Sequence, residues 1–355
     1  MKWGWKSKMT VETIHQNMLN NTSDKFDKSN GSWTYDVEKS VAIELNEHEI
    51  KTENIIDKIN VENLTGEELT RFVFQRTGIK RNLATFASGE VLITVSAATS
   101  VKVGDLVAAD DIFYQFIKEE NFTTAGQYYV IVRCVQSGSS GNVPIGAINS
   151  FPTTLANISA VINEVAFDNG YPEETDASLR QRYYDKLQRP GKAGNKYHYK
   201  EWAQSVSGVG KVKVFPRWNG ALTVKVAVLD VNNGLASPSL IDRVFNHIES
   251  ERPFGANVTV ITGEELVVNI SSTFVLNSGY TFDQVKPLIE NRLASYFRSI
   301  AFEEGLAYIS HAQIGRELLD VEGIEDYSNL LLNGSTGNLP IGDTQVPIVG
   351  GVVNT

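Results

Sequence analysis

Histidine serves proteins as a metal ligand and as a general base near neutral pH, and this sequence contains five histidines. They are His15, His48, His198, His247 and His311, and no zinc-binding motif links any two of them. The sequence therefore predicts no metal site.

A glycine-rich stretch at residues 191–196 superficially resembles a phosphate-binding loop. Such a loop needs four residues between its glycines, and a serine or threonine after its lysine to bind magnesium. Gly191 and Gly194 are too close together, and Lys192 is followed by Ala193. We expect a loop that ends at a helix cap rather than a cofactor site.

The remaining reactive groups lack the partners that catalysis requires. The serines near residue 139 do not lie in the Gly-x-Ser-x-Gly pattern of a hydrolase nucleophile. Adjacent carboxylates at 110–111, 173–174 and 303–304 do not give the separation across a cleft that a glycosidase needs. The single cysteine, Cys134, lies in an apolar run and is expected to be buried and unreactive. We therefore predict no catalytic, cofactor-binding or metal residue and no enzyme activity.

The composition is that of a soluble, folded chain with several domains. Its 355 residues exceed the length at which one hydrophobic core usually stops growing. A formal net charge of -10 argues against binding to nucleic acid, which needs clustered Lys and Arg. No apolar run approaches the roughly 20 residues that cross a bilayer, and residues 1–9 lack the apolar stretch of a signal peptide. We expect synthesis in the cytoplasm and no membrane partner.

Residues 1–85 are predicted to form a helical region. Between 36 and 59 the sequence has no proline or glycine, and one set of residues recurs at alternating steps of four and three. This is the heptad spacing of a helix that packs against other helices. We call the set the heptad stripe; its members are Val41, Leu45, His48, Thr52, Ile55 and Ile59.

A second helix is predicted over residues 66–77. It begins with a capping box, in which Thr65 and Glu68 bond reciprocally, and it ends at Gly78. The heptad stripe has two possible partners: helices of other chains, in a bundle, or this second helix of the same chain.

Residues 86–168 are predicted to be a small β domain. Residues that favour strands dominate at 90–95, 112–117 and 128–135, and turn-forming residues separate them. A further strand is predicted from residue 155 to residue 167.

Helices and strands mix in two last predicted domains, 169–264 and 265–355, so the fold class is α+β with several domains. Caps at Thr175 or Asp176, at Asn195 and at Ser237 predict three helices in the first domain. In both domains a helix is followed by a glycine and a strand, at Gly208 and at Gly323. This indicates either a duplication or an ordinary connection between helix and strand.

Many of these residues form a collinear series that resembles the signature of the baseplate J-like family. The series is strongest between residues 138 and 256, and it extends over nearly the whole chain. Its main members are Gly141, Asn142, Glu174, Thr175, Asp176, Leu179, Arg180, Arg182, Gly208, Val209, Arg252, Pro253 and Gly255. Many relatives have two glycines where this chain reads Asn169, Gly170 and Tyr171, so we expect that turn to differ in shape.

Two arginines of the series lie on one predicted helix. Arg180 and Arg182 project on different faces, so at most one serves a given neighbour, and Arg180 is within reach of Asp176 one turn earlier. Either both are solvated, or one forms a bidentate pair with a carboxylate across a domain or subunit boundary.

The resemblance implies a structural wedge protein in the baseplate of a contractile tail. Such wedges surround the central hub and spike, and the sheath contracts when their ring rearranges. Two copies and one smaller wedge protein bundle their N-terminal helices into a heterotrimer, and the C-terminal domains pair to close the ring. The other implied partners are neighbouring wedges, the hub and sheath-proximal baseplate proteins, with no cofactor. The implied location is the baseplate of a virion, tailocin or other injection particle made in a bacterial host.

Two other functions suit a tail protein. A cell-wall hydrolase needs a carboxylate pair or a zinc site, and the sequence shows neither. A receptor-binding protein usually shows β-rich repeats, whereas half of this chain is predicted to be helical or mixed.

Overall fold

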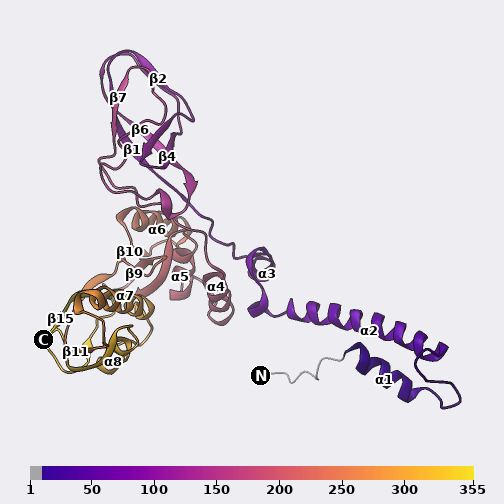
Figure 1. The fold of residues 1–355 in the computed structure, drawn as a ribbon. Coiled ribbons are helices and arrows are strands. Elements are labelled where there is room, and N and C mark those ends of the chain that lie inside the picture. The colour runs from indigo at the N-terminus through magenta and orange to yellow at the C-terminus, as the bar shows by residue number, and fades with distance from the viewer. Residues whose placement is uncertain (1–9) are drawn as a thin grey trace. The chain divides into compact units, whose positions relative to one another are not determined.

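A computed structural model describes residues 10–355, apart from the side chains of Asn54 and Asp57. The expectation for residues 1–9 lies outside the described part. The chain divides into two compact units, Met1–Gly78 and Ile79–Thr355, so the division falls at Gly78 rather than at residue 85. The second unit contains three large hydrophobic cores, one in the β region and one in each mixed region. Figure 1 shows the strands and helices of these regions. The α+β fold class is confirmed, and the division into four domains stays a prediction.

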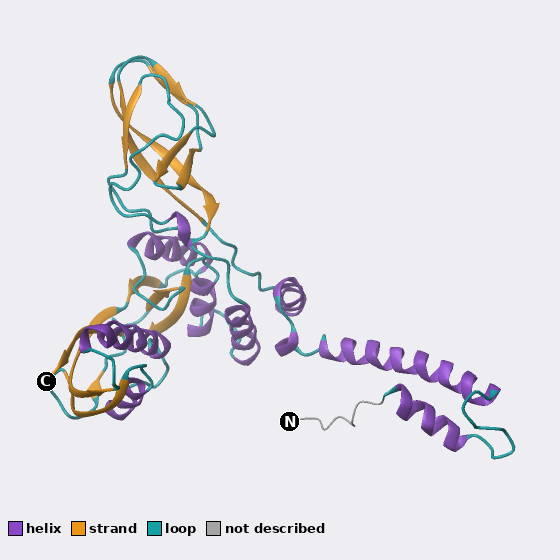
Figure 2. Cartoon of the chain, in the orientation of Figure 1, coloured by secondary structure: helices purple, strands orange, loops and turns teal. Residues whose placement is uncertain are grey.

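The described part of the first unit is helical (Figure 2). Its elements are α1 (Val11–Asn21), α2 (Trp33–Asp57), a 3-10 helix (Val61–Asn63) and α3 (Gly66–Thr77). α1 packs against α2, and Ile14, His15 and Ala42 are buried. The His15 imidazole Nε2 lies 3.0 Å from the Tyr35 carbonyl oxygen, which ties the two helices together.

Two details of this unit differ from expectation. α2 ends at Asp57, so Ile59 of the heptad stripe lies beyond the helix. The capping box of α3 is absent: the Thr65 side chain makes no cap hydrogen bond, and Glu68 instead accepts a bond from Lys58 at 2.6 Å. α3 otherwise has the predicted bounds and ends at Gly78 with a φ of 75°, a conformation that glycine adopts without strain.

The β region forms a five-stranded antiparallel sheet in the order β3-β4-β6-β1-β7. Its strands are β1 (Phe86–Val95), β3 (Leu106–Ala109), β4 (Ile112–Phe116), β6 (Gly126–Ser137) and β7 (Ile158–Ile162). β2 (Thr99–Val101) and β5 (Glu120–Phe122) form a separate pair. The three strands expected before residue 136 are confirmed. Within residues 155–167, only β7 forms. Cys134 is buried, as expected.

The central mixed region has a three-stranded sheet in the order β10-β9-β8, in which β9 is antiparallel to β8 and parallel to β10. Its elements are α4 (Asp176–Gln188), α5 (Lys196–Gln204), β8 (Val209–Pro216), β9 (Thr223–Asp230), α6 (Pro238–Glu251) and β10 (Asn257–Thr262). The predicted caps are confirmed: the side chains of Thr175, Asn195 and Ser237 each accept a backbone N–H bond in the first turn.

The C-terminal mixed region has a sheet in the order β13-β11-β15. It contains β11 (Glu264–Leu276), α7 (Phe282–Ile300), β12 (Tyr308–Ile309), α8 (His311–Leu319), β13 (Ile324–Leu332), β14 (Leu339–Pro340) and β15 (Gln345–Asn354). β11 pairs antiparallel with β13 and parallel with β15. A small shared core that includes Leu229, Phe302 and Val346 joins this region to the central sheet.

The two glycines that follow helices occupy similar surroundings. Gly208 and Gly323 have φ values of 102° and 94°, and the rings of Tyr171 and Tyr280 lie against them. The chain order differs, because β8 precedes the middle strand β9 whereas β13 follows the middle strand β11. The resemblance between the two regions is therefore not that of a simple tandem repeat.

The chain enters and leaves the β region side by side. The Thr85 N–H donates to the Tyr171 carbonyl oxygen at 2.9 Å. The Asn142 side-chain amide bonds to both the N–H and the carbonyl of Gly170, each at 2.9 Å. A methyl group on Gly170 would lie 2.5 Å from the Gly138 carbonyl oxygen, so this crossing has no room for a side chain.

Gly170→Ala should therefore destabilise the protein by about 1–3 kcal/mol, because the added methyl group must displace the hydrogen-bonded backbone around Gly138. Urea unfolding measures the effect. Gly126→Ala is the control in the same region, since its added carbon would meet Tyr128 at an ordinary 3.4 Å. Equal unfolding midpoints for the two variants would contradict the tight crossing.

Candidate functional site

The heptad stripe lies exposed along α2. Val41 and Leu45 keep 42% and 47% of their surface exposed, and Ile55 and Ile59 keep 63% each. Trp33, near the start of the helix, is also exposed. Apolar side chains in a continuous exposed row usually mark a surface that another molecule covers.

The polar members of the stripe, His48 and Thr52, are also exposed. The Thr52 hydroxyl donates to the His48 carbonyl oxygen at 2.8 Å, one turn earlier in the helix. α3 does not cover the apolar members of the stripe. The structure therefore does not show the packing of the stripe against α3 that was the alternative within the same chain. α1 packs on α2, and Ala42 of α2 is fully buried, so within the first unit the stripe stays exposed.

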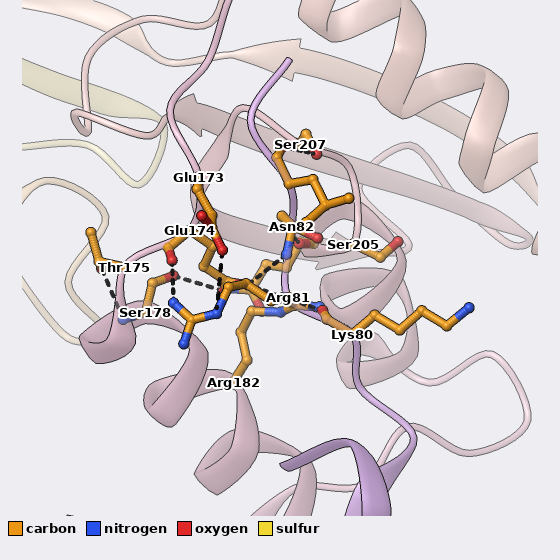
Figure 3. A network of polar contacts seen from close by, with 12 residues as sticks. Lys80, Arg81, Asn82, Glu173, Glu174, Thr175, Ser178, Arg182, Ser205 and Ser207 are labelled. Atoms are coloured by element: carbon orange, nitrogen blue, oxygen red, sulfur yellow. Dashed lines mark hydrogen bonds and ion pairs between the residues drawn. The ribbon is translucent and has the colours of Figure 1, made fainter. Parts of the chain in front are cut away.

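A cluster of buried charges joins residues 79–85 to the start of α4 (Figure 3). The Glu174 side chain is only 5% exposed and accepts a bond from Arg182 Nη1 at 2.7 Å. The Arg81 side chain, 8% exposed, donates to the Glu174 carbonyl oxygen at 2.7 Å and pairs with Asp176. Because a buried charge has lost its water, each of these groups depends on its partners.

Glu174 also organises the backbone beside it. Its Oε2 accepts the N–H of Asn82 at 3.0 Å, and its own N–H donates to the Asn82 carbonyl oxygen at 2.9 Å. The Asn82 side chain donates to the Gln204 carbonyl oxygen at 2.9 Å, at the end of α5. Residues 79–85 are thereby fixed to the central region, although they precede the β region in the sequence.

The arginines of α4 lie differently from one another. Arg182 is buried and pairs with Glu174 of its own region, so Arg182 does not pair across a domain boundary. The boundary role stays a prediction for Arg180. Arg81 was not predicted as a partner of Asp176, although the run Gly78 to Arg81 resembles the family.

Other members of the family series hold turns and cores. Gly141 packs so closely on Cys134 that a methyl group there would lie 2.7 Å from the sulfur. Leu179 of α4 is fully buried, and Val209, at the start of β8, is also in the core. In the turn expected to differ in shape, the Asn169 side chain bonds to the N–H and the carbonyl of Ser88, at 2.8 and 2.9 Å.

Arg252 caps the end of α6 with a bidentate ion pair. Its Nε and Nη2 donate to the two carboxylate oxygens of Glu249 at 2.6 and 2.7 Å. These bonds hold the pKa of Glu249 below its ordinary value and raise the pKa of Arg252. Beyond the cap, Pro253 packs on Gly194, and Gly255 turns the chain with a φ of 83°.

Within residues 10–355, no three His, Cys, Asp or Glu side chains gather where they could hold a metal ion. No helix in that part of the chain is long and apolar enough to span a membrane. The structure does bring together an exposed apolar row on α2 and a buried ionic junction within the second unit. Exposed apolar surface of the first kind is typical of a surface that binds another protein.

Most of the chain matches known protein families and relatives. Residues 90–170 match the Baseplate J-like protein barrel domain, residues 191–262 the Baseplate J-like central domain, and residues 268–355 the Baseplate J-like protein C-terminal domain. The phage-like element PBSX protein XkdT of Bacillus subtilis (strain 168) is 32% identical over 354 residues, which are 97% of each chain. Baseplate protein gp47 of Escherichia phage Mu is 28% identical over 264 residues, 70% of this chain and 72% of that protein. A chain of the cryo-EM baseplate structure of the anti-feeding prophage aligns over 96% of this chain and 89% of its own, with a TM-score of 0.45 and 12% identity.

Glu174→Ala should destabilise the second unit by about 3–5 kcal/mol, because it leaves Arg182 buried without its charged partner. Chemical denaturation measures the loss. Glu304→Ala is the matched control: Glu304 pairs with Arg189 at 3.2 Å on the surface, where losing a pair costs about 1 kcal/mol or less. A Glu174→Ala protein as stable as the control would show that the junction is not energetically important.

Arg252→Ala should raise the pKa of Glu249 toward its ordinary value, because the bonds that lower it are lost. A carboxyl group whose folded pKa is depressed stabilises the fold above its unfolded pKa, and this contribution disappears as pH falls through the folded value. NMR titration of the Glu249 carboxyl group measures the change, with the remote Arg189→Ala as control. An unchanged titration curve in Arg252→Ala would refute the assignment.

Proposed function

Because the chain belongs to the baseplate J-like family, we propose that it is a non-catalytic structural subunit in the wedge of a contractile-tail baseplate. It sits in the ring around the central hub and spike, and it relays the rearrangement that triggers sheath contraction. The particle is a virion or a phage-tail-like machine that is assembled in a bacterial host. The observation that carries the proposal is the exposed heptad stripe, together with a family whose relatives include a baseplate protein.

The stripe supports a helix bundle between chains. α2 has 25 residues, and at 1.5 Å per residue it is about 37 Å long, whereas α1, which packs on it, has 11 residues. A second copy of α2 and one helix of a smaller wedge protein cover the apolar positions. His48 and Thr52 lie at the middle of the stripe, where polar groups select register and oligomer number.

The C-terminal sheet supports pairing between subunits. β13 and β15 are its two edge strands, so each has one side on which no strand of this sheet is hydrogen-bonded. Proteins cover or pair such edges, because an unpaired edge binds any available strand. On β15, Val353 is 53% exposed, which adds apolar surface to the open edge. Pairing of these domains between wedges closes the ring.

The buried junction supports the relay. Residues 79–85 follow directly after the helical unit, and Arg81 and Asn82 fix them to the start of α4. Because these residues are bonded to the central region, a force applied at Gly78 acts directly on that region and is not dissipated in a flexible linker. Charge-assisted hydrogen bonds are stronger and more geometrically specific than neutral ones, so this junction is suited to hold the two segments in a fixed arrangement.

Leu45→Asp should abolish co-purification with the smaller wedge protein, because an unpaired carboxylate inside a bundle costs several kcal/mol. Thermal unfolding of the second unit should stay unchanged, since Leu45 belongs to the other unit. Ser40→Asp is the matched control, with the same new charge at an exposed position outside the stripe. Wild-type association of Leu45→Asp, or its global unfolding, would exclude the bundle.

A further inference from the structure

β6 carries apolar side chains on both of its faces. Its residues alternate between core and solvent, with Val130, Val132 and Cys134 buried and the residues between them exposed. The exposed positions hold Tyr129, Ile131, Arg133 and Val135. An antiparallel sheet with one solvated face usually has polar residues at its outward positions. β6 therefore has the sequence of a strand that is covered on both sides.

Residues of the neighbouring strands β1, β4 and β7 extend this surface across the sheet. Leu92 of β1 lies opposite Tyr129, and Ile162 of β7 lies opposite Leu92. We call the whole surface the outer face; its apolar members are Phe86, Leu92, Phe113, Ile117, Tyr129, Ile131, Val135 and Ile162. Each of them except Leu92 is at least 40% exposed. Contiguous apolar surface of this extent marks a contact with another protein.

Glu90 and Arg133 are opposite charges within the outer face, and at its border the Tyr129 hydroxyl donates to Glu164 Oε2 at 2.7 Å. Glu90 is opposite Ile131 and Arg133 is opposite Ser88, so the two charges are diagonal neighbours on adjacent strands. In the described chain no salt bridge joins either of them to an opposite charge. The Arg133 guanidinium instead lies over the Phe86 ring, 4.9 Å from its centroid.

We propose that the outer face binds the outer face of a second copy of this chain, about a two-fold axis that passes between Glu90 and Arg133. When a two-fold axis lies in the plane of an interface, the same surface of each copy contacts the other copy. Each Glu90 then meets the Arg133 of the other copy, which forms two ion pairs. The apolar residues near Arg133, such as Phe86 and Val135, cover those near Glu90, such as Leu92.

The charges favour a second copy over an unrelated partner, because one surface supplies both halves of both ion pairs. A helix laid on the outer face would cover the apolar side chains, but it would need its own acid and base at the matching diagonal. The outer face belongs to the second unit and the heptad stripe to the first, so this interface is additional to the helix bundle.

The test reverses one of the two charges at a time in the full-length chain. Tagged Glu90→Arg protein is co-refolded with equal amounts of untagged Glu90→Arg and untagged Arg133→Glu protein, and the proteins recovered on the tag are counted by mass spectrometry. The two-fold arrangement predicts a preference of at least about tenfold for Arg133→Glu, because that mixture restores both opposite-charge contacts. Two Glu90→Arg copies instead bring only positive charges together.

The control uses Lys102→Glu and Glu119→Arg, two exposed charges outside the strands of the outer face, and it should show no preference. Glu90 and Arg133 are exposed, so each single variant should keep the wild-type melting temperature. Association through the heptad stripe or the C-terminal edges captures both untagged proteins equally. A ratio of one therefore overturns this proposal without touching the helix bundle, and so does the absence of any capture.

Discussion

Each of the two units, taken by itself, leaves a row of apolar side chains exposed, and the proposed assembly rests on that constraint. α2 packs against α1 through one side and leaves the heptad stripe in solvent. β6 repeats the pattern, with one set of side chains in the core and the other on the outer face. Burial of apolar surface contributes about 25 cal/mol per Å², so both surfaces favour a partner over water. Covering these surfaces with other chains would therefore stabilise the proposed assembly.

The relay proposed for this chain requires stiff connections between the parts of the second unit. Glu174 provides one, because it bonds to Arg182 and to the backbone of Asn82 with almost no exposure to water. The shared core around Phe302 provides another, between the central and C-terminal sheets. The entry and exit of the β region are held by Asn142 and Gly170. The second unit is therefore linked by packed and bonded crossings instead of free loops.

The sequence predicted features that local interactions decide. The caps at Asn195 and Ser237 and the bounds of α3 depend on residues within one helical turn, and they are confirmed. The capping box at Thr65 failed because Lys58, outside the helix, binds Glu68. Arg81 was missed because its partners lie far along the chain, and no local pattern reports such contacts. The outer face was visible only as an apolar run, since the strand register is needed to separate its two sides.

The central claim is that the heptad stripe is buried by other chains in the assembled baseplate. Amide hydrogen exchange along α2, compared between the isolated protein and the intact particle, tests it most directly. A helix that lacks partners opens often and exchanges quickly, and a bundled helix is protected. The predicted result is strong additional protection of residues 41–55 in the particle, with little change in the core of the central sheet. Equal exchange of α2 in both states would contradict the claim.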